Sequence, residues 1–405
     1  MVKQCVILLG GLGTRLGALT ADTPKPLLPV AGAPFLEVLI GEARRRGFDR
    51  FLLLAGYKSE VVRDYIEGTD VPGRFKATVE ICVEPEPLGT GGALVNALPQ
   101  LDETFLLLNG DTWFDFNWLD LVATTLKTGA DCGMALRLVD KPDRYETLAL
   151  DGTRITEFRA RQAGLERALI NGGVYVMKRA CLEGMQAPFS LEGALLPRLA
   201  QEGRLAGAAY DGFFIDIGIP ETYDDAQTSV PAHRRRPAIF LDRDGVLNED
   251  TNYAHKPEDI IWKAGAKEAV KRFNDLGLYV FVVTNQAGVA HGLYDEETIL
   301  HLHEWMAREL RAEGASVDDW RYCPFHPNGK VEAYTAAHDW RKPGPGMLLD
   351  LMKHWPVDIT QSLLIGDRET DIGAANAAGL PASYLFTGPD LLAFIDTLSL
   401  PGNAP

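Results

Sequence analysis

Short apolar runs that end in glycine or polar residues recur along this chain, and they constrain its fold more than any other feature. In the first half they are residues 6–9, 51–56, 79–84, 104–111 and 172–177. The segments between them are long enough for crossover helices, such as SEVVRDYIEG at residues 59–68. This alternation predicts an α/β domain with a largely parallel sheet.

The alternation stops at residues 226–238, AQTSVPAHRRRPA, which contain two prolines, three consecutive arginines and no apolar periodicity. Such a composition is typical of a linker, and we expect its arginines to be solvated. Three new strand-like runs follow, AIFLDRDGVL, LYVFVVTNQ and SLLIGD. We therefore predict a first domain at residues 1–228, a linker at 229–237 and a second α/β domain at 238–405.

Composition narrows the partners of the protein. A net charge of −16 disfavours a nucleic-acid partner, whereas small anionic substrates fit if local cations or metal ions offset the field. No apolar stretch is long enough to span a bilayer, and the N-terminus lacks a signal-type segment. The five cysteines are scattered without a CxxC pair, as in reduced proteins. We expect a cytoplasmic protein without a membrane partner, and homo-oligomerisation stays open.

The first apolar run leads into the loop GGLGTRL, in which three glycines precede Thr14 and Arg15. Glycines let backbone amides approach a bulky anion closely. Lys25 lies between two prolines that would hold its cation in place. An amide-lined loop with two fixed cations suits a triphosphate.

This loop and the following PKPLLPV resemble the signature of the sugar-1-phosphate nucleotidyltransferases. The resemblance implies a mixed sheet, with Arg15 and Lys25 stabilising charge as an oxygen of a sugar 1-phosphate attacks the α-phosphorus and pyrophosphate leaves. It implies that the nucleotide is bound by Gly10, Gly11, Gly13, Thr14, Glu86, Gly89, Gly91 and Asn109.

Further pieces follow in the order of that family. Asp111 ends the run LNGD and Asp216 lies in FIDIGIPETY, and the resemblance implies that they share a magnesium ion. Magnesium prefers one or two carboxylates together with phosphate oxygens. The turn NGGVY resembles the sugar-binding turn of the family, so Asn171 and Gly172 are expected to bind sugar.

Two departures from the family pattern lie in the expected sugar pocket. Glu146 stands in RYE, where the family commonly has RYG, and Ala160–Arg161 stand where a Glu–Lys pair is common. Arg161 can still hold a phosphate. An alternative is therefore a regulatory nucleotide-sugar-binding domain without catalysis, although Arg15, Lys25 and the two aspartates are retained.

The second half places Asp242 and Asp244 two residues apart after a buried strand, where two carboxylates would repel unless a cation joined them. With Thr284, Lys342 and Asp367 in later motifs, this half resembles the haloacid dehalogenase (HAD) superfamily of phosphatases. The resemblance implies that Asp242 is the nucleophile and Asp244 the acid and base, and that Thr284 and Lys342 bind the phosphoryl group. It implies that magnesium is held by Asp242, Asp244 and Asp367.

Motif spacing predicts a parallel sheet with a minimal cap and an open active site. Residues 322–347 resemble the heptose-bisphosphate 7-phosphatases. We expect Asn285, Gln286 and Arg341 to contact substrate, Arg341 because it precedes Lys342, although an ion pair of Arg341 with Asp339 is an alternative. Asp371 either orients Lys342 or caps the following helix. His301 and His303 are expected at the surface.

The zinc loop of those phosphatases is altered in this chain. Cys323 is kept, but Phe325, His338 and Trp340 stand where the other ligands would be. A rearranged site of Cys323, His326, His338 and Asp339 is an alternative, yet we predict packing of Phe325 and Trp340 and no zinc.

The two halves fit consecutive steps. Removal of the 7-phosphate from a heptose 1,7-bisphosphate leaves a heptose 1-phosphate, which the first half would activate. EPLGTGG and GYKSEVVRDYIEG look most like guanylyltransferases, so GTP is the preferred donor. An alternative is a mannose-1-phosphate guanylyltransferase joined to a phosphatase of another sugar phosphate.

Overall fold

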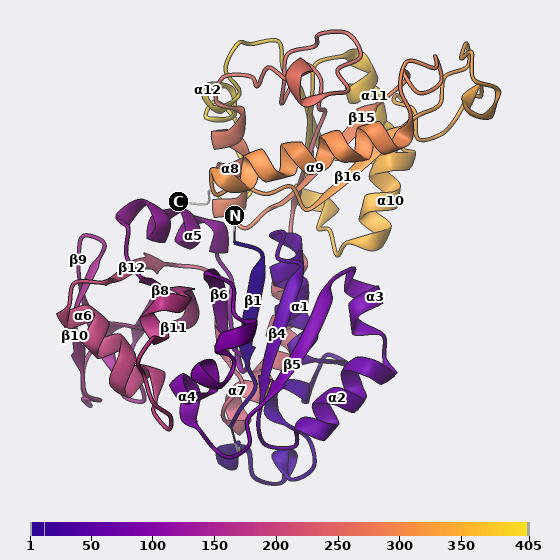
Figure 1. The fold of residues 1–405 in the computed structure, drawn as a ribbon. Helices are drawn as coiled ribbons and strands as arrows, with labels where there is room; N and C mark the ends of the chain where they lie inside the picture. Colours follow the sequence, from indigo (N-terminus) through magenta and orange to yellow (C-terminus); the bar gives the residue numbers. More distant parts are fainter. Residues whose placement is uncertain (1, 12, 403–405) are drawn as a thin grey trace. The chain divides into compact units, whose positions relative to one another are not determined.

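The computed structural model describes residues 2–11 and 13–402 and divides them after His233 into two compact units. The first unit is built on a nine-stranded sheet in the order β5-β4-β1-β6-β11-β8-β12-β10-β9 (Figure 1). Its strands are β1 (Gln4–Leu8), β4 (Arg50–Ala55), β5 (Thr78–Val83), β6 (Thr104–Asn109), β8 (Cys132–Asp140), β9 (Thr147–Asp151), β10 (Arg154–Arg159), β11 (Arg167–Lys178) and β12 (Leu205–Tyr210).

This sheet is mixed. β1 runs parallel to β4 and β6, whereas β11 runs antiparallel to both β6 and β8. The largely parallel sheet that the alternation predicts therefore holds only for one side, because β9, β10 and β11 follow β8 through short connections that reverse the chain. A second sheet of two strands is formed by β7 (Thr112–Phe114) and β13 (Phe214–Asp216). Along the chain, β7 follows β6 of the large sheet.

Helices cover both faces of the large sheet. Along β1, Cys5 and Ile7 belong to one apolar layer and Val6 and Leu8 to the other, as the alternation of a buried strand requires. The helices are α1 (Phe35–Arg45), α2 (Ser59–Gly68), α3 (Val71–Phe75), α4 (Gly89–Asn96), α5 (Trp118–Thr128), α6 (Leu196–Gln201) and α7 (Pro220–Arg234). The predicted helix at 59–68 coincides with α2.

The segment predicted to be an irregular linker is in part helical. Residues 229–234 form the end of α7, and Ala226 and Val230 bury one face of that helix in the core. The sequence pattern missed this helix because only Tyr223, Ala226 and Val230 make up its buried stripe, and Pro231 lies within it.

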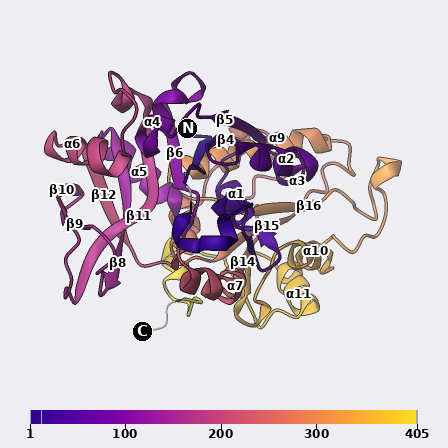
Figure 2. The ribbon, with the colours of Figure 1, turned by 90° about the horizontal axis from the view of Figure 1, so that it is seen from below.

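The second unit has a five-stranded, fully parallel sheet in the order β16-β15-β14-β17-β18. Helices α10 and α11 pack together on one face of it (Figure 2). Its elements are β14 (Ala238–Leu241), α8 (Ala266–Asp275), β15 (Tyr279–Asn285), α9 (Glu296–Ala312), β16 (Asp319–Cys323), α10 (Gly346–His354), β17 (Leu363–Gly366), α11 (Glu369–Ala378), β18 (Ala382–Leu385) and α12 (Leu391–Ile395). Within the described chain, no helix is both long and apolar enough to cross a membrane.

Candidate functional site

In the second unit, the expected catalytic residues meet at the carboxyl ends of three neighbouring strands, where parallel sheets bind ligands. Asp242 follows β14, Thr284 lies at the end of β15 and Asp367 follows β17. Together with Asp244 and Lys342, Asp242 and Thr284 line a cavity of about 290 Å³. The sequence-predicted phosphatase residues are thus brought to one place.

Lys342 lies between two buried carboxylates. Its Nζ is 2.9 Å from Asp242 Oδ1 and 2.6 Å from Asp371 Oδ1, and it donates to the Val283 carbonyl at 2.8 Å. Burial raises the pKa of Asp242 to about 7 against the pull of Lys342. Asp371 Oδ2 also accepts from the Arg368 amide, so Asp371 both orients Lys342 and caps α11.

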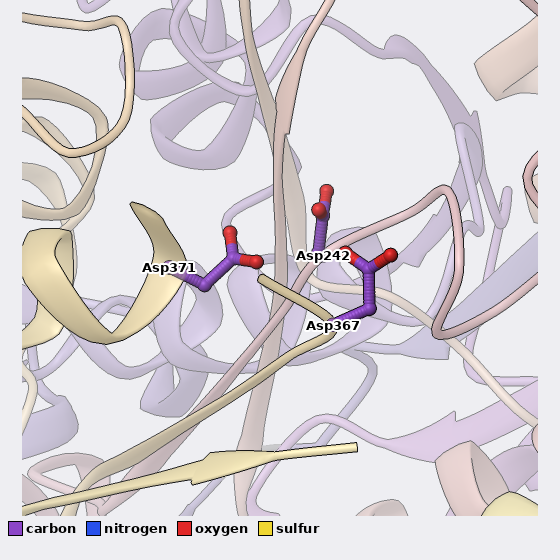
Figure 3. A group of neighbouring side chains, drawn as sticks. All are labelled: Asp242, Asp367 and Asp371. Carbon is purple, nitrogen blue, oxygen red and sulfur yellow. The ribbon is translucent and has the colours of Figure 1, made fainter. Parts of the chain in front are cut away.

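Three carboxylates of this unit come close enough to share a cation. Asp242, Asp367 and Asp371 each offer an oxygen within 4.8 Å of the others (Figure 3). Asp367 Oδ1 is buried without a hydrogen-bond partner, and burial together with Asp371 raises the pKa of this carboxyl. An all-oxygen donor set with an unpaired buried oxygen fits a hard cation such as magnesium. Gly245, at φ +87°, leaves room for Asp367, because a Cβ there would lie 2.2 Å from its Oδ2.

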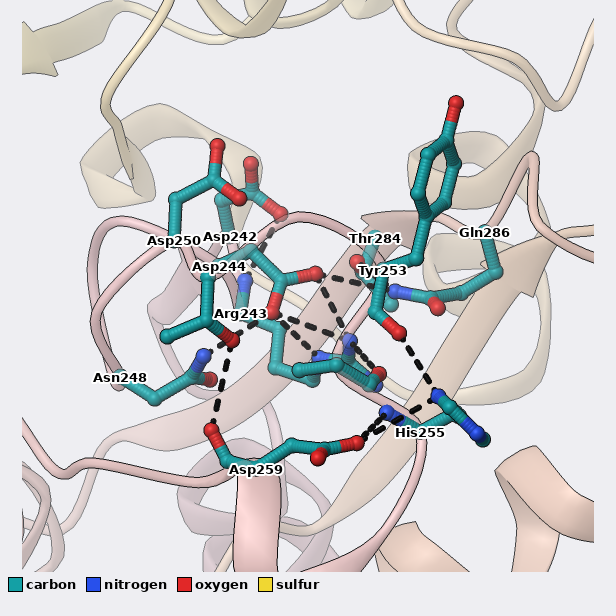
Figure 4. A network of polar contacts seen from close by, with 12 residues as sticks. Asp242, Arg243, Asp244, Asn248, Asp250, Tyr253, His255, Asp259, Thr284 and Gln286 are labelled. Carbon is teal, nitrogen blue, oxygen red and sulfur yellow. Dashed lines mark hydrogen bonds and ion pairs between the residues drawn. The ribbon is translucent and has the colours of Figure 1, made fainter.

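The carboxylate of Asp244 is held by a network of hydrogen bonds that also includes Asp242 (Figure 4). The fully buried Arg243 donates to both Asp244 oxygens, at 3.0 and 2.8 Å from Nη2, and Asn248 donates at 2.9 Å. The Asp244 side chain is absent from the carboxylate group described above. This placement at the cavity wall suits acid and base chemistry, and the second role expected for Asp244, metal ligation, stays a prediction.

Two residues expected to contact substrate also hold their neighbours in place. Asn285 exchanges hydrogen bonds with the backbone of Lys342, at 3.1 and 3.0 Å. Gln286 donates to Asp244 at 3.1 Å and to Thr284 at 2.9 Å, and accepts from Tyr294. Both line the cavity, as does Arg341.

The altered zinc loop is packed by aromatic side chains. The Phe325 ring stacks on His338 with centroids 4.3 Å apart, and His338 lies edge-on to Trp340. Cys323 is fully buried, and burial raises the pKa of its thiol. The absence of zinc stays a prediction.

The expectation that His303 lies at the surface is wrong. Its ring is buried on α9 and stacks on Trp320 at 4.6 Å, with no hydrogen-bond partner for either nitrogen. Burial, with Arg243 nearby, holds the pKa of His303 well below its ordinary value. The spacing from His301 indicated different helix faces but not which face meets the core.

In the first unit, pairing of two strands brings the expected metal ligands together. β13 pairs with β7 so that Asp216 lies opposite Thr112, next to Asp111, and the Ile217 amide donates to the Asp111 carbonyl. Burial and the Asp111 charge raise the pKa of Asp216. Lys25 Nζ lies 2.6 Å from Asp111 Oδ2. Two adjacent carboxylates of this kind also fit magnesium bound together with phosphate oxygens.

Two cavities adjoin this pair. One, of about 120 Å³, is lined by Gly10, Gly11, Lys25 and Asn109; the other, of about 500 Å³, is lined by Arg15 and Asn171 together with both departures from the family pattern, Glu146 and Arg161. Arg144 also lines the larger cavity, and within the described chain none of Arg15, Arg144 and Arg161 forms an ion pair. Gly13 precedes Thr14 in the left-handed region, and a Cβ there would lie 2.7 Å from Thr20.

Several glycines expected to contact ligand also pack closely against the protein. A Cβ at Gly91 would lie 2.1 Å from the Phe189 ring, and one at Gly89 would lie 2.6 Å from the Phe189 carbonyl. A Cβ at Gly172 would likewise meet the ring of Phe114. Glu86 is exposed and lines neither cavity. These glycines are needed for packing, whatever ligand approaches their other side.

Sequence reasoning missed two carboxylates. Glu84 follows β5, its Oε2 accepts from the Leu88 amide, and its Oε1 would lie 3.1 Å from a Cβ at Gly10. Glu192 lines both cavities. The sequence offered one signal for Glu84: like the glycine loop and Gly56, it follows an apolar strand.

Comparison with known proteins assigns a relative to each half. Residues 4–233 match the family described as nucleotidyl transferase. They are similar to D-glycero-alpha-D-manno-heptose 1-phosphate guanylyltransferase of Campylobacter jejuni, with 34% identity over 222 residues, 54% of this chain and 96% of that protein. The crystal structure of HddC from Yersinia pseudotuberculosis, also solved with GMP-PN, shares 31% identity and a TM-score of 0.51 over 56% of this chain and all of that one.

The second half has relatives of its own. Residues 339–389 match the family described as HAD-hydrolase-like. The half is 49% identical over 161 residues to D-glycero-beta-D-manno-heptose-1,7-bisphosphate 7-phosphatase of Rhodopseudomonas palustris, covering 40% of this chain and 89% of that protein.

Proposed function

The chain belongs to the nucleotidyl transferase family and joins to that domain a phosphatase of the HAD type, and from this we propose that it carries out two consecutive reactions on one sugar. The second unit would remove the 7-phosphate of a heptose 1,7-bisphosphate. The first would then transfer GMP from GTP to the resulting heptose 1-phosphate. The boundary after His233 would separate the two activities.

The proposed phosphatase reaction is supported above all by the position of Asp242. Its carboxylate faces the cavity and is held by Lys342 at 2.9 Å, which suits attack on phosphorus and binding of the transferring phosphoryl group by the ammonium. Asp244, fixed by Arg243, would protonate the leaving oxygen and then activate water. Magnesium on Asp242 and Asp367 would neutralise charge on the phosphoryl oxygens.

The transfer reaction is supported by unpaired cations in the larger cavity. Arg15, Arg144 and Arg161 face it without carboxylate partners, so they are available to phosphate groups of the two substrates. Lys25 would bind phosphate oxygens near the reacting centre, beside magnesium held by Asp111 and Asp216.

The choice of GTP is supported by the relatives and by Glu84. The guanylyltransferase relatives act on the alpha anomer, whereas the phosphatase relatives divide between alpha and beta.

Guanine presents adjacent N–H donors, and a carboxylate accepts from both. Glu84 Oε1 lies beside Gly10 of the glycine loop and has no hydrogen-bond partner in the described chain, so we infer that it would accept from guanine, although Glu84 lines neither cavity.

The experiment that tests this proposal supplies both anomers of D-glycero-D-manno-heptose 1,7-bisphosphate with each nucleoside triphosphate and magnesium. Products are identified by mass spectrometry. We expect inorganic phosphate followed by GDP-heptose from the alpha anomer. Phosphate release without any nucleotide sugar would instead support a regulatory first domain.

A further inference from the structure

The two cavities of the first unit meet at a shared wall. Asn109, Asp111 and Glu192 line both of them. The smaller cavity contains the glycine loop, and the larger contains Asn171 of the expected sugar turn. A group on this wall can contact either substrate, or both.

Glu192 is fixed in this wall by two hydroxyl groups. Thr90 and Ser190 both donate to its Oε2, at 2.9 and 3.0 Å. Each hydroxyl is fixed in turn, because Thr90 accepts from the Leu191 amide at 2.8 Å and Ser190 from the Gly193 amide at 3.1 Å. The carboxylate is therefore held in one orientation before any ligand binds.

Two acceptor oxygens on the wall lack partners within the described chain. Glu192 Oε1 accepts no hydrogen bond, and Asn109 Oδ1 is buried without one. Asp111, the third residue of the wall, is paired with Lys25, whereas Glu192 has no cationic partner among the residues that the structure describes. A carboxylate and an amide oxygen would repel a phosphate, but they suit hydroxyl donors.

We propose that Glu192 is a specificity-determining residue that accepts hydrogen bonds from a vicinal hydroxyl pair of a substrate, with Asn109 as a second acceptor. This proposal rests on the transfer reaction proposed above. The hydroxyls belong either to the sugar 1-phosphate, at C2 and C3, or to the ribose of the nucleotide. Asn171 in the same cavity favours the sugar.

The test combines variants with substrates that lack one hydroxyl. Transfer by Glu192→Leu is measured with heptose 1-phosphate, its 2-deoxy and 3-deoxy analogues, and GTP or 2′-deoxy-GTP. We expect kcat/KM with the complete substrates to fall about 100-fold, which is the size expected for losing hydrogen bonds to a charged group. With a deoxy sugar the loss should shrink at least fivefold. Glu192→Gln, which keeps one acceptor, should recover part of the activity.

Controls separate this role from a structural one. Glu183→Leu makes the same change at an exposed position of the first unit and should leave transfer unchanged. Thr90→Val should reproduce a smaller part of the loss, while Thr90→Ser should not. If the loss shrinks with 2′-deoxy-GTP instead, the hydroxyl pair is that of ribose and the role of Glu192 stands.

An equal loss with every substrate would overturn the proposal, since it would show that Glu192 only supports the fold of residues 190–195. Failure of the wild-type chain to form any nucleotide sugar is a different result. That result would contradict the proposed transfer reaction itself, and not only the proposed recognition of substrate hydroxyl groups by Glu192.

Discussion

Lys342 shows how single residues of the phosphatase site depend on one another. It is buried and bonded to Asp242, Asp371 and the Val283 carbonyl, so removing one partner leaves a buried charge uncompensated. Gln286 links Thr284 and Asp244, because its side-chain amide donates a hydrogen bond to each of them. These positions were predictable one by one from motifs, but the contacts between them were not, because they depend on side-chain orientation.

Arg341 is expected to distinguish the two ends of the phosphatase substrate. It lines the cavity beside Lys342, and within the described chain it forms no ion pair, with Asp339 or any other carboxylate. Arg341→Ala should weaken kcat/KM for heptose 1,7-bisphosphate by about 1.5 to 3 kcal/mol, the range for hydrogen bonds to charged groups. Turnover of heptose 7-phosphate should barely change.

Arg272→Ala, an exposed arginine on α8, is the matched control for that measurement. Equal losses on both substrates would mean that Arg341 supports the loop or the reacting phosphate.

His303 predicts a dependence of stability on pH. Its pKa in the folded state is depressed by burial, so only the unfolded chain takes up this proton as the pH falls below about 6.5. The folded state should therefore lose up to about 1.4 kcal/mol per pH unit below that value through this group. By calorimetry, His303→Phe, which keeps the stacking on Trp320, should lose less stability between pH 7.5 and 5.5 than the wild type does.

The exposed His301 supplies the control, because His301→Phe should keep the wild-type dependence. Parallel stability curves for wild type and His303→Phe would show that His303 is not the group responsible.

At the scale of elements, the sequence patterns predicted strands and long amphipathic helices well. The predicted strands at 51–56 and 104–111 correspond to β4 and β6, and the predicted helix at 59–68 corresponds to α2. The direction of β11 and the helical end of α7 were not predictable from local patterns, because strand pairing and burial against the sheet decide them. The glycines of α4 were assigned to ligand approach, and their contact with Phe189 appears only in the folded chain.

We predict that the loop between β16 and α10 binds no zinc. Phe325 stacks on His338 where the sequence resemblance implies metal ligands, and Cys323 is fully buried. Elemental analysis of purified protein should find less than one zinc per chain, and a chelator should leave its unfolding temperature unchanged. About one tightly held zinc per chain would contradict the packing interpretation.

At the scale of the whole molecule, each unit brings together the residues proposed for its own reaction at the carboxyl ends of strands of its own sheet. Fold class and the two-domain organisation were accessible from the sequence, because both sets of motifs occur in order. Two relatives of the second half are named as 7-phosphatases of the alpha bisphosphate and the relatives of the first half as guanylyltransferases of the alpha 1-phosphate, whereas the relative that is 49% identical to the second half is named for the beta anomer. We propose that one chain contains two independent sites for consecutive steps.

The most direct test measures both reactions in one variant, Asp242→Asn. It should abolish phosphate release from heptose 1,7-bisphosphate and leave transfer of GMP to supplied heptose 1-phosphate within about twofold of wild type. Asp111→Asn should show the reverse, with transfer reduced on the order of 100-fold or more by loss of a charge-stabilising carboxylate. Loss of both activities in a folded Asp242→Asn protein would contradict the account.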